Sequence, residues 1–352
     1  MAVFPELKQA SLTELSGLAA GLSDDDLCLA VDSGGTKTSA ILYTAGFRKA
    51  AAAKCGSLRS ATTPQELVSA DLSRLLEDLG LTKDPGAAPK LITGAFDHHA
   101  ANALRGIFPD AKILRLGEMV LGFSSSRLFG NGILALSGTG CTIYSRINGI
   151  SDSLGGYGSM ISDEGSGYWI SRAALGAAIK DHEGRGPFTS LTAAAAAHFG
   201  GLPRSDLRSA LFRIYSQNNT SPVGTIAGFV PAVVKTASEG DPVADKILSD
   251  AGVAVAEQVI SLIRKNDLPK DLPLTISGSV WKKNPVYLRT FRERLLSEGV
   301  AGPFVFPRFE PVCGAMVAQL FAKYGDSERL EEGLAVLEND FREFVIHDDA
   351  WT

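Results

Sequence analysis

A glycine-containing segment near the N-terminus combines residue types that could bind phosphate. Residues 31–38 read VDSGGTKT and begin at the end of an apolar run. Two glycines allow a tight turn and close approach to a ligand, and successive backbone N–H groups in such a turn can surround phosphate oxygens. Asp32 could hold Mg²⁺ through water. A plain hairpin turn is the alternative, and the GxxxxGK[ST] pattern of a Walker loop is absent.

Two further segments place small residues directly after an apolar strand pattern. Residues 136–141 read LSGTGC, and residues 276–282 read ISGSVWK. The first could cradle phosphate through its backbone, as 31–38 could. The second lacks side chains that would keep a flat purine away from its backbone. Two phosphate-binding turns, one in each half of the chain, could hold one nucleotide from opposite sides.

A fourth segment, residues 155–170, reads GGYGSMISDEGSGYWI. In one interpretation Ser162 caps a helix running towards Lys180, and Asp163 and Glu164 lie in its first turn, where carboxylates suit the helix dipole. In the other, Asp163 or Glu164 accepts hydrogen bonds from substrate hydroxyls. The density of glycine favours close backbone approach to a ligand, and therefore the second interpretation.

The elements that would position these segments alternate between strand and helix patterns. A strand, a glycine turn and a second strand occur at 27–43 and again at 132–146, which indicates two similar α/β halves. Shorter strands are expected at 91–93, 113–116 and 274–277, and helices at 64–79 and 100–107. Apolar residues at helical spacing also predict an N-terminal helix over 5–22 and a C-terminal helix with one apolar face.

Composition restricts the function classes. The 352 residues carry a formal net charge of −5 with no long block of one sign, so nothing indicates nucleic-acid binding. We find no apolar stretch long enough to span a membrane and no signal-peptide pattern, and we expect a cytoplasmic protein. The four cysteines form no CxxC pair, which favours a reducing compartment.

The four segments, in this order, resemble the sugar-kinase branch of the actin-like ATPases. The likeness is greatest to the N-acetylglucosamine kinases within the BadF/BadG/BcrA/BcrD ATPase group, and it extends over most of residues 27–325. Its most specific parts are GGxGxxxxDEGSGYWI at 155–170 and GSVWK at 278–282. Residues 227–229, 239–242 and 311–315 are also similar to that group.

The resemblance implies an α/β actin-like ATPase fold, related to ribonuclease H, with two similar domains and an interdomain cleft that holds ATP and Mg²⁺. It divides the chain into an N-terminal helical extension, 1–23, a first domain, 24–135, and a second domain, 136–326. The C-terminal helix, 327–346, would return to the first domain.

The resemblance also assigns site residues. The metal residue would be Asp32, which would bind Mg²⁺ through water, and the catalytic residue would be Glu118. The residues expected to bind ATP are Gly34, Gly35, Thr36, Lys37, Thr38, Ser137, Gly138, Thr139, Gly140, Gly228, Gly278, Ser279, Val280, Lys282 and Gly314. The residues expected to contact the sugar are Glu118, Thr139, Gly140, Gly156, Tyr157 and Asp163.

Glu118 stands where the family usually has a catalytic Asp, in the segment RLGEM at 115–119. A carboxylate is needed there because the attacking hydroxyl must lose a proton as it meets the γ-phosphate. Glu is one methylene longer, and a misplacement of about 1 Å can cost roughly a hundredfold in rate. A solvated loop carboxylate is the alternative interpretation of Glu118.

Other departures from the family concern the sugar. The segment GSLRS at 56–60 lacks the usual Asn, Tyr157 replaces a Trp, and Cys141 replaces a Ser. Residues 96–99, FDHH, replace a glycine-rich sugar loop, and we interpret the two histidines as polar residues at a cleft rim or a helix start rather than metal ligands. Arg59 could face an anionic substituent such as a lactyl carboxylate or a phosphate.

The expected function is ATP-dependent phosphorylation of an amino sugar at a hydroxyl, with the primary C6 hydroxyl favoured. The substrate would be N-acetylglucosamine or a relative such as glucosamine or a muramic derivative, and the enzyme would be a homodimer with no nucleic-acid or membrane partner. Two alternatives stay open. One is a non-catalytic sugar or nucleotide sensor, and the other is an ATPase that activates a dehydratase.

Overall fold

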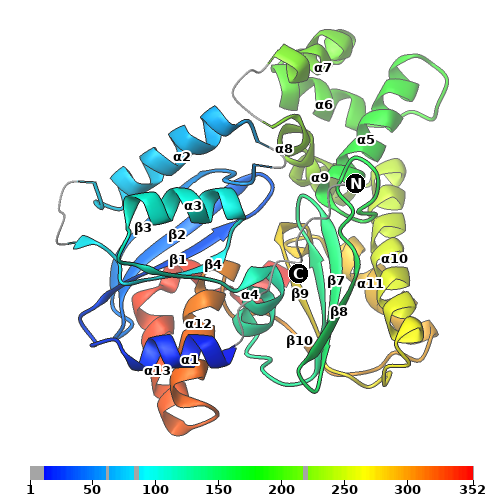
Figure 1. Ribbon diagram of the computed structural model, residues 1–352. Helices are drawn as coiled ribbons and strands as arrows, with labels where there is room; N and C mark the ends of the chain where they lie inside the picture. Colours follow the sequence, from blue (N-terminus) through cyan, green and yellow to red (C-terminus); the bar gives the residue numbers. More distant parts are fainter. Residues whose placement is uncertain (1–11, 61–62, 83–86, 217–220, 352) are drawn as a thin grey trace, which may run out of the picture. The chain divides into compact units, whose positions relative to one another are not determined.

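The computed structural model describes residues 12–60, 63–82, 87–216 and 221–351. The chain divides into two compact units. Unit 1 comprises Met1–Arg127 and Pro307–Ile346, and unit 2 comprises Leu128–Phe306 and His347–Thr352. Each contains one five-stranded mixed sheet with helices packed on it (Figure 1).

The sheet of unit 1 has the order β3-β2-β1-β4-β5. Its strands are β1 (Leu27–Ser33), β2 (Lys37–Thr44), β3 (Lys49–Gly56), β4 (Leu91–Ala95) and β5 (Lys112–Arg115). β1, β2 and β3 form an antiparallel meander, whereas β4 and β5 run parallel to β1. The apolar run of β1 is buried along nearly its whole length because the strand is central and covered on both faces.

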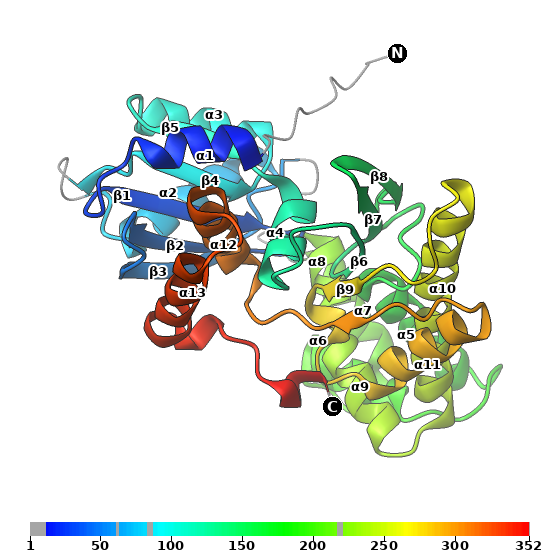
Figure 2. The ribbon, with the colours of Figure 1, turned by 90° about the horizontal axis from the view of Figure 1, so that it is seen from below.

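Helices cover both faces of this sheet. Apolar side chains of β1, β2, β4, α2 (Gln65–Asp78) and α3 (His98–Ile107) form one core. On the other face α12 (Pro311–Tyr324) packs on β1, β2 and β4, with α1 (Leu12–Ala20) and α13 (Glu328–Asp340) beside it (Figure 1 and Figure 2). α4 (Gly117–Ser125) packs along α12.

The sheet of unit 2 repeats this arrangement with the order β10-β9-β6-β7-β8. Its strands are β6 (Gly132–Ser137), β7 (Cys141–Ile147), β8 (Ile150–Gly155), β9 (Leu274–Ser277) and β10 (Phe304–Val305). β6, β7 and β8 again form an antiparallel meander, and β9 and β10 run parallel to β6. The predicted α/β fold with two similar halves is therefore confirmed.

The helices of unit 2 lie mostly between β8 and β9 in the sequence. Their bounds are α5 (Gly167–His182), α6 (Leu191–Gly200), α7 (Leu207–Ser216), α8 (Pro222–Ala227), α9 (Val230–Ser238), α10 (Pro242–Lys265) and α11 (Pro285–Ser297). α10 contacts the meander strands and packs along α11. Among the described residues, no helix has both the length and the apolar character needed to cross a membrane.

Several expectations differ from the structure in detail. The helix expected over 5–22 is described only as α1, and residues 5–11 lie outside the described part of the chain. A helix capped by Ser162 was the alternative interpretation of the fourth segment, and it is wrong. The helix begins at Gly167, and the hydroxyl of Ser166 accepts from the backbone N–H of Trp169 at 3.2 Å.

The domain bounds also differ from the compact units. A boundary at 135/136 would cut β6, whereas the units change at 127/128 and keep that strand whole. Residues 307–326, expected in the second domain, belong to unit 1 because α12 packs on β1 and α4. The C-terminal segment expected at 327–346 also lies in unit 1.

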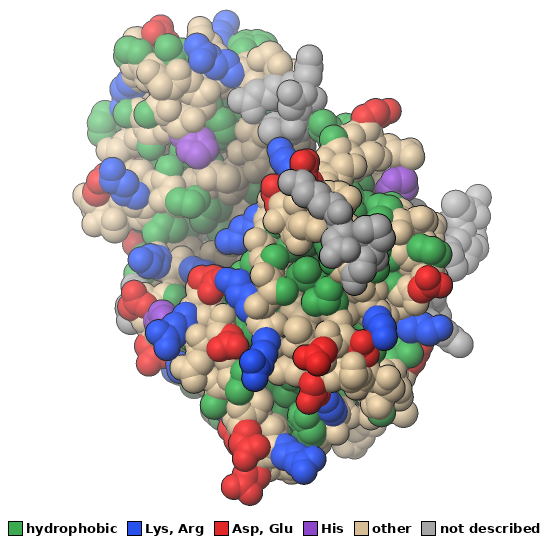
Figure 3. All heavy atoms as spheres, turned by 90° about the vertical axis from the view of Figure 1, so that its left-hand side faces the viewer, with side chains coloured by type: hydrophobic (Ala, Val, Ile, Leu, Met, Phe, Trp, Pro, Cys, Tyr) green, Lys and Arg blue, Asp and Glu red, His purple; other side chains and the backbone are tan. Residues whose placement is uncertain are grey.

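On the face that Figure 3 shows, Lys and Arg side chains are interspersed with Asp and Glu, and no broad patch of one sign covers that face. This pattern agrees with the sequence, which has no long block of charges of one sign. Strong electrostatic attraction of a polyanion such as nucleic acid would need a large surface of positive charge.

The contact of α4 with α12 depends on a glycine. A Cβ added at Gly314 would lie 2.2 Å from the carbonyl oxygen of Leu121, which is backbone and cannot move aside easily. Gly314 therefore serves helix packing within unit 1, and its expected contact with ATP stays a prediction.

We predict that Gly314→Ala lowers the free energy of unfolding by about 1–3 kcal/mol through overpacking. The matched control is Gly176→Ala in α5, where an added Cβ meets nothing within 4 Å. That change should stabilise by up to about 1 kcal/mol through helix propensity. Urea unfolding followed by circular dichroism measures both, and equal effects of the two substitutions would contradict the packing role.

Candidate functional site

The turn between β1 and β2 is held from outside by the chain that follows β3. The hydroxyl of Thr38 donates to the Ser33 hydroxyl oxygen at 3.0 Å, and the backbone N–H of Leu58 donates to that same Ser33 oxygen at 3.1 Å. Ser57 donates from its hydroxyl to the carbonyl oxygen of Gly34 at 2.8 Å. The side chains of Ser33 and Thr38 thus fix the shape of the turn, and Thr38 is fully buried.

The tip of this turn is open. The backbone N–H of Gly34 donates to the carbonyl oxygen of Lys37 at 2.9 Å, while Thr36 and Lys37 are exposed. An exposed turn of small residues with one cation suits phosphate binding. The contacts of residues 34–38 with ATP stay predictions.

Glu118 is tied to this turn through an arginine. Nε of Arg59 donates to the carbonyl oxygen of Ser33 at 2.9 Å, and Nη2 of Arg59 donates to Oε1 of Glu118 in an ion pair. The Arg59 and Glu118 side chains keep exposures of 33% and 26%, so both can still meet a ligand. Glu118 lies in the first turn of α4, directly after Gly117 (φ +79°), and its backbone is therefore fixed.

Asp32 ends β1 within the field of these groups. The pKa of Asp32 is raised to about 7, mainly by burial and then by the charges of Glu118 and, less strongly, Glu310, whereas Arg59 and Lys37 oppose the shift. The negative charges of Glu118 and Glu310 near Asp32 favour a cation there, and carboxylate oxygen is the donor that Mg²⁺ prefers. The residues therefore fit the predicted Mg²⁺ contact of Asp32. Within the described residues no cluster of three or more Asp, Glu, His or Cys side chains could hold a metal.

The corresponding turn of unit 2 joins β6 to β7 and rests on the start of α5. The backbone N–H of Gly138 donates to the carbonyl oxygen of Gly140 at 2.9 Å, and the Gly138 carbonyl accepts from the N–H of Gly167 at 2.7 Å. The backbone N–H of Tyr168 donates to the carbonyl oxygen of Thr139 at 3.4 Å. The turn is thus placed at the N-terminus of a helix, where the dipole favours anions.

Asp163 is the carboxylate that unit 2 places beside this turn. It is 3% exposed with φ +63°, and Oδ2 accepts from the Ser159 hydroxyl at 3.4 Å. A Cβ at Gly140 would come within 2.5 Å of that oxygen. Oδ1 has no partner within the described part of the chain. Burial raises the pKa of Asp163, although the N–H groups of Cys141 and Gly158 oppose this. Strained backbone and an unsatisfied buried acceptor are common at ligand sites.

The predicted sugar residues Gly156 and Tyr157 follow β8 in the same loop. Gly156 has φ +73°, and its N–H donates to the carbonyl oxygen of Cys141 at 3.0 Å. The side chain of Tyr157 is mostly exposed. The loop therefore presents an aromatic ring outside and the Asp163 carboxylate inside.

The predicted adenosine segment lies directly against the unit 2 turn. Gly278 has φ +104°, and a Cβ there would be 2.1 Å from the carbonyl oxygen of Ser137. Ser279 is exposed, whereas the side chains of Val280 and Trp281 are buried and anchor the segment in the core. Lys282 is partly exposed. Gly228 is exposed at the end of α8.

The structure also shows the contacts of Asp97, His98, Arg59 and the cysteines. Asp97 caps α3, with Oδ1 accepting from the Ala100 N–H at 2.9 Å and Oδ2 from the Ser60 N–H at 2.7 Å. His98 begins that helix, which confirms the helix-start interpretation. Arg59 pairs with Glu118, a contact that no local pattern indicates, because the two residues are far apart in the sequence. All four cysteines, which lie in the described residues, are free and buried.

The duplicated sheets and the turns at their strand ends define an α/β protein of the actin-like ATPase fold. The chain belongs to the BadF/BadG/BcrA/BcrD ATPase family, whose model matches residues 29–319. Among solved structures, a Streptomyces griseus ROK family glucokinase in complex with glucose and AMPPNP has TM-score 0.55 at 15% identity, over 85% of this chain and 100% of that one. A Chromobacterium violaceum protein, named as a candidate N-acetylglucosamine kinase, has TM-score 0.61 at 21% identity, over 84% and 100%.

Two relatives match in sequence. N-acetyl-D-glucosamine kinase of Dictyostelium discoideum is 26% identical over 203 residues, which are 57% of this chain and 62% of that protein. The match thus spans less than two thirds of that kinase. N-acetylmuramic acid/N-acetylglucosamine kinase of Clostridium acetobutylicum is 25% identical over 263 residues, 72% of this chain and 84% of that protein.

Substitutions at two glycines of unit 2 can distinguish a role in ligand binding from a role in folding. A Cβ at Gly138 meets nothing within 4 Å, and its φ lies outside the left-handed region. We predict that Gly138→Ala leaves the unfolding midpoint nearly unchanged but weakens Mg-ATP binding about tenfold or more, because a methyl group intrudes where phosphate approaches. Isothermal calorimetry and thermal unfolding measure the two effects.

Gly278→Ala is the comparison for that prediction. It should destabilise by on the order of 1–3 kcal/mol, because the backbone is strained and collides with Ser137. Unchanged ATP affinity in Gly138→Ala would show that the turn does not bind phosphate.

Proposed function

We propose that this protein transfers the γ-phosphoryl group of ATP to a hydroxyl of an amino sugar, N-acetylglucosamine or a close relative, with the primary C6 hydroxyl as acceptor. The names of the two relatives support the substrate class. The single observation that carries the proposal is the Arg59 bridge between the Ser33 carbonyl and Glu118. Through it a carboxylate is held next to the turn that suits phosphate.

In the proposed mechanism Glu118 accepts the proton of the attacking hydroxyl. The backbone N–H groups of the two turns and the cation of Lys37 stabilise charge on the transferred phosphoryl group. Asp32 would hold Mg²⁺ through water, and the ion would supply positive charge for the phosphate oxygens. Asp163 accepts a hydrogen bond from a second sugar hydroxyl through its unsatisfied oxygen, which orients the sugar.

The two units contribute different parts under this proposal. Unit 1 supplies the general base, the metal contact and one phosphate turn. Unit 2 supplies the other phosphate turn, the adenosine segment from Gly278 to Lys282 and the sugar loop with Tyr157 and Asp163. Exclusion of water from the bound substrates would limit wasteful hydrolysis of ATP.

Arg59 bears on the choice of sugar. Its guanidinium already binds the Ser33 carbonyl and the Glu118 carboxylate. An anionic lactyl group that recruited Arg59 would have to compete with Glu118 for it and would disturb the base. The pairing therefore favours a neutral amino sugar over a muramic derivative, in place of the anionic recognition that the sequence left open.

We predict that kcat/KM, measured as sugar-dependent ADP release, is about tenfold or more higher with N-acetylglucosamine than with N-acetylmuramic acid. A tenfold ratio corresponds to about 1.4 kcal/mol in activation free energy. A coupled ADP assay over both sugars, glucosamine, N-acetylmannosamine and glucose measures this. A higher kcat/KM for the muramic derivative would contradict the neutral-sugar assignment. ATP consumption that no sugar accelerates would contradict the kinase and favour the ATPase alternative, whereas no ATP consumption at all would favour the non-catalytic sensor.

Glu118 is tested by two substitutions. Glu118→Gln keeps the shape and removes the basicity, so kcat should fall by about 10²–10⁴-fold while ATP affinity stays nearly constant. Glu118→Asp should also be slower, because the shorter side chain draws the carboxylate away from Arg59 and from the hydroxyl. Steady-state kinetics and ATP titration measure these effects.

Arg59→Lys is the companion variant, since it keeps the charge and loses the forked contact. It should lower kcat by less than Glu118→Gln does. If Glu118→Gln and Glu118→Asp both retained full activity, Glu118 would not be the base. Asp97 would be a poor successor because both its oxygens are engaged at the start of α3.

A further inference from the structure

One buried tyrosine of unit 2 touches all three ligand segments of that unit without belonging to any of them. Tyr287 lies in α11 and is fully buried. Its hydroxyl donates to the carbonyl oxygen of Gly165 at 2.8 Å. Gly165 follows the Asp163–Glu164 pair of the sugar loop, so this bond fixes the loop two residues from its buried carboxylate.

The same carbonyl is also bound by the phosphate turn. The hydroxyl of Ser137 donates to the Gly165 oxygen at 2.9 Å. Ser137 ends β6 and opens the turn that continues through Gly138. One acceptor with two lone pairs therefore joins the phosphate turn to the sugar loop, and Tyr287 is the second donor that holds this acceptor in place.

The ring of Tyr287 reaches the third segment. Its centroid lies 4.7 Å from that of Trp281, with the two planes at 63°, in an edge-to-face contact. Trp281 is fully buried beneath the segment that begins at Gly278. A shift of Tyr287 would therefore be felt by the adenosine segment and the sugar loop together.

The sugar loop also packs directly on α10. Gly165 has φ +82°, and a Cβ there would be 2.3 Å from Cγ2 of Val255 and 2.8 Å from the Ala251 carbonyl oxygen, both on α10. Gln258, also on α10, donates from Nε2 to the Glu164 carbonyl oxygen at 2.9 Å. Successive carbonyls of the sugar loop are thus bound by residues from the two packed helices.

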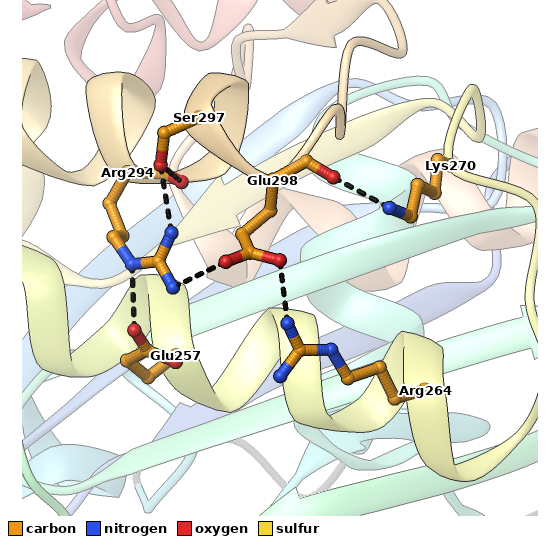
Figure 4. Close-up of polar contacts among 6 residues, drawn as sticks. All are labelled: Glu257, Arg264, Lys270, Arg294, Ser297 and Glu298. Carbon is orange, nitrogen blue, oxygen red and sulfur yellow. Dashed lines mark hydrogen bonds and ion pairs between the residues drawn. The ribbon is translucent and has the colours of Figure 1, made fainter.

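An ion-pair network joins those helices at their surface (Figure 4). Arg294 of α11 pairs with Glu257 of α10 at 2.7 Å and with Glu298 at 2.8 Å. Glu298 also pairs with Arg264 of α10 at 2.5 Å, and its carbonyl accepts from Nζ of Lys270 at 2.6 Å. These surface ion pairs add to the packing of α11 along α10, the two helices whose residues bind the sugar loop.

We propose that Tyr287 is a positioning residue that couples sugar binding to nucleotide binding in unit 2, an inference that rests on the proposed function. When nucleotide orders the phosphate turn and the Gly278 segment, the shared carbonyl and the Trp281 contact hold the sugar loop in its binding geometry. By linkage, sugar must then tighten nucleotide binding by the same factor. Tyr287 touches neither substrate, and its effect acts through Gly165 and Trp281.

The test compares two tyrosines that lose the same atom. Tyr287→Phe removes the hydroxyl while Ser137 still satisfies the Gly165 carbonyl, so the fold should be kept. Tyr43→Phe in unit 1 is the matched control, because Tyr43 is also fully buried and its hydroxyl donates to Gln319 at 2.6 Å, outside every ligand segment. Thermal unfolding should show similar small losses for both.

The readout is the affinity for an ATP analogue with a non-transferable γ-phosphate, with Mg²⁺, with and without N-acetylglucosamine. We expect the sugar to raise this affinity about tenfold in the wild type and in Tyr43→Phe, and less than about twofold in Tyr287→Phe. Loss of the coupling in Tyr287→Phe should also appear as a KM for ATP that is several-fold above that of the wild type and of Tyr43→Phe at saturating sugar. Equal coupling in the two variants would overturn the proposal.

A second measurement keeps the inference separate from the proposed function. Hydrogen–deuterium exchange of residues 155–166 needs only the ATP analogue and no turnover. The analogue should protect this loop in the wild type and in Tyr43→Phe, but much less in Tyr287→Phe. If the wild type phosphorylated no sugar and this difference were still present, the proposed function would fail and the coupling would stand. Equal protection in all three proteins would refute the coupling even in an active kinase. If Tyr287→Phe did not fold, Ser137→Ala, which removes the other donor to Gly165, would give the exchange test at an analogue concentration that saturates this variant, because Ser137 is itself a predicted ATP-binding residue.

Discussion

A close contact between two backbones, repeated in both units, sets the position of everything at the strand ends. In unit 1 Gly94 of β4 has φ +142°, and a Cβ there would lie 1.7 Å from the carbonyl oxygen of Val31 in β1. In unit 2 Gly278 follows β9, and a Cβ would lie 2.1 Å from the carbonyl oxygen of Ser137 at the end of β6. Only a hydrogen atom fits at either place. The parallel strand can therefore approach the hairpin strand where the latter enters its turn.

This constraint places the predicted binding residues at the corresponding strand ends in each unit. The strand that carries Gly94 leads to Asp97 and the start of α3, and the strand that precedes Gly278 leads to the buried Trp281. Side chains then tie each turn to a neighbouring element: Arg59 joins the Ser33 carbonyl to Glu118 in unit 1. In unit 2 the Gly165 carbonyl accepts from both Ser137 and Tyr287. In each unit, backbone carbonyl oxygens therefore hold the side chains that surround the turn.

The sequence predicts the parts of this arrangement that depend on local pattern. Apolar runs ending in small residues give both hairpins, and the glycine-rich motifs identify the turns. The third strands, β3 and β8, are missed because edge strands need few buried residues: β3 is alanine-rich with Lys at two of its exposed positions, and β8 mixes polar and apolar residues, none of which is fully buried. The helix start at Ser166 rather than Ser162 depends on the left-handed backbone of Asp163 and Gly165, which tertiary contacts impose.

Contacts between residues distant in the sequence are the part that no pattern supplies. Neither the pairing of Arg59 with Glu118 nor the hydroxyl of Tyr287 on Gly165 has a local signal. The same is true of α12, which joins unit 1 through its packing on the sheet and the close contact of Gly314 with α4. The most direct measurement of the account is ³¹P NMR of the purified protein with Mg-ATP and N-acetylglucosamine. We expect the γ-phosphate signal of ATP to be replaced by the signal of a sugar phosphate monoester that is coupled to the C6 protons, in an amount equal to the ADP formed. Inorganic phosphate as the sole product, or no consumption of ATP by the wild-type protein, would contradict the proposed activity.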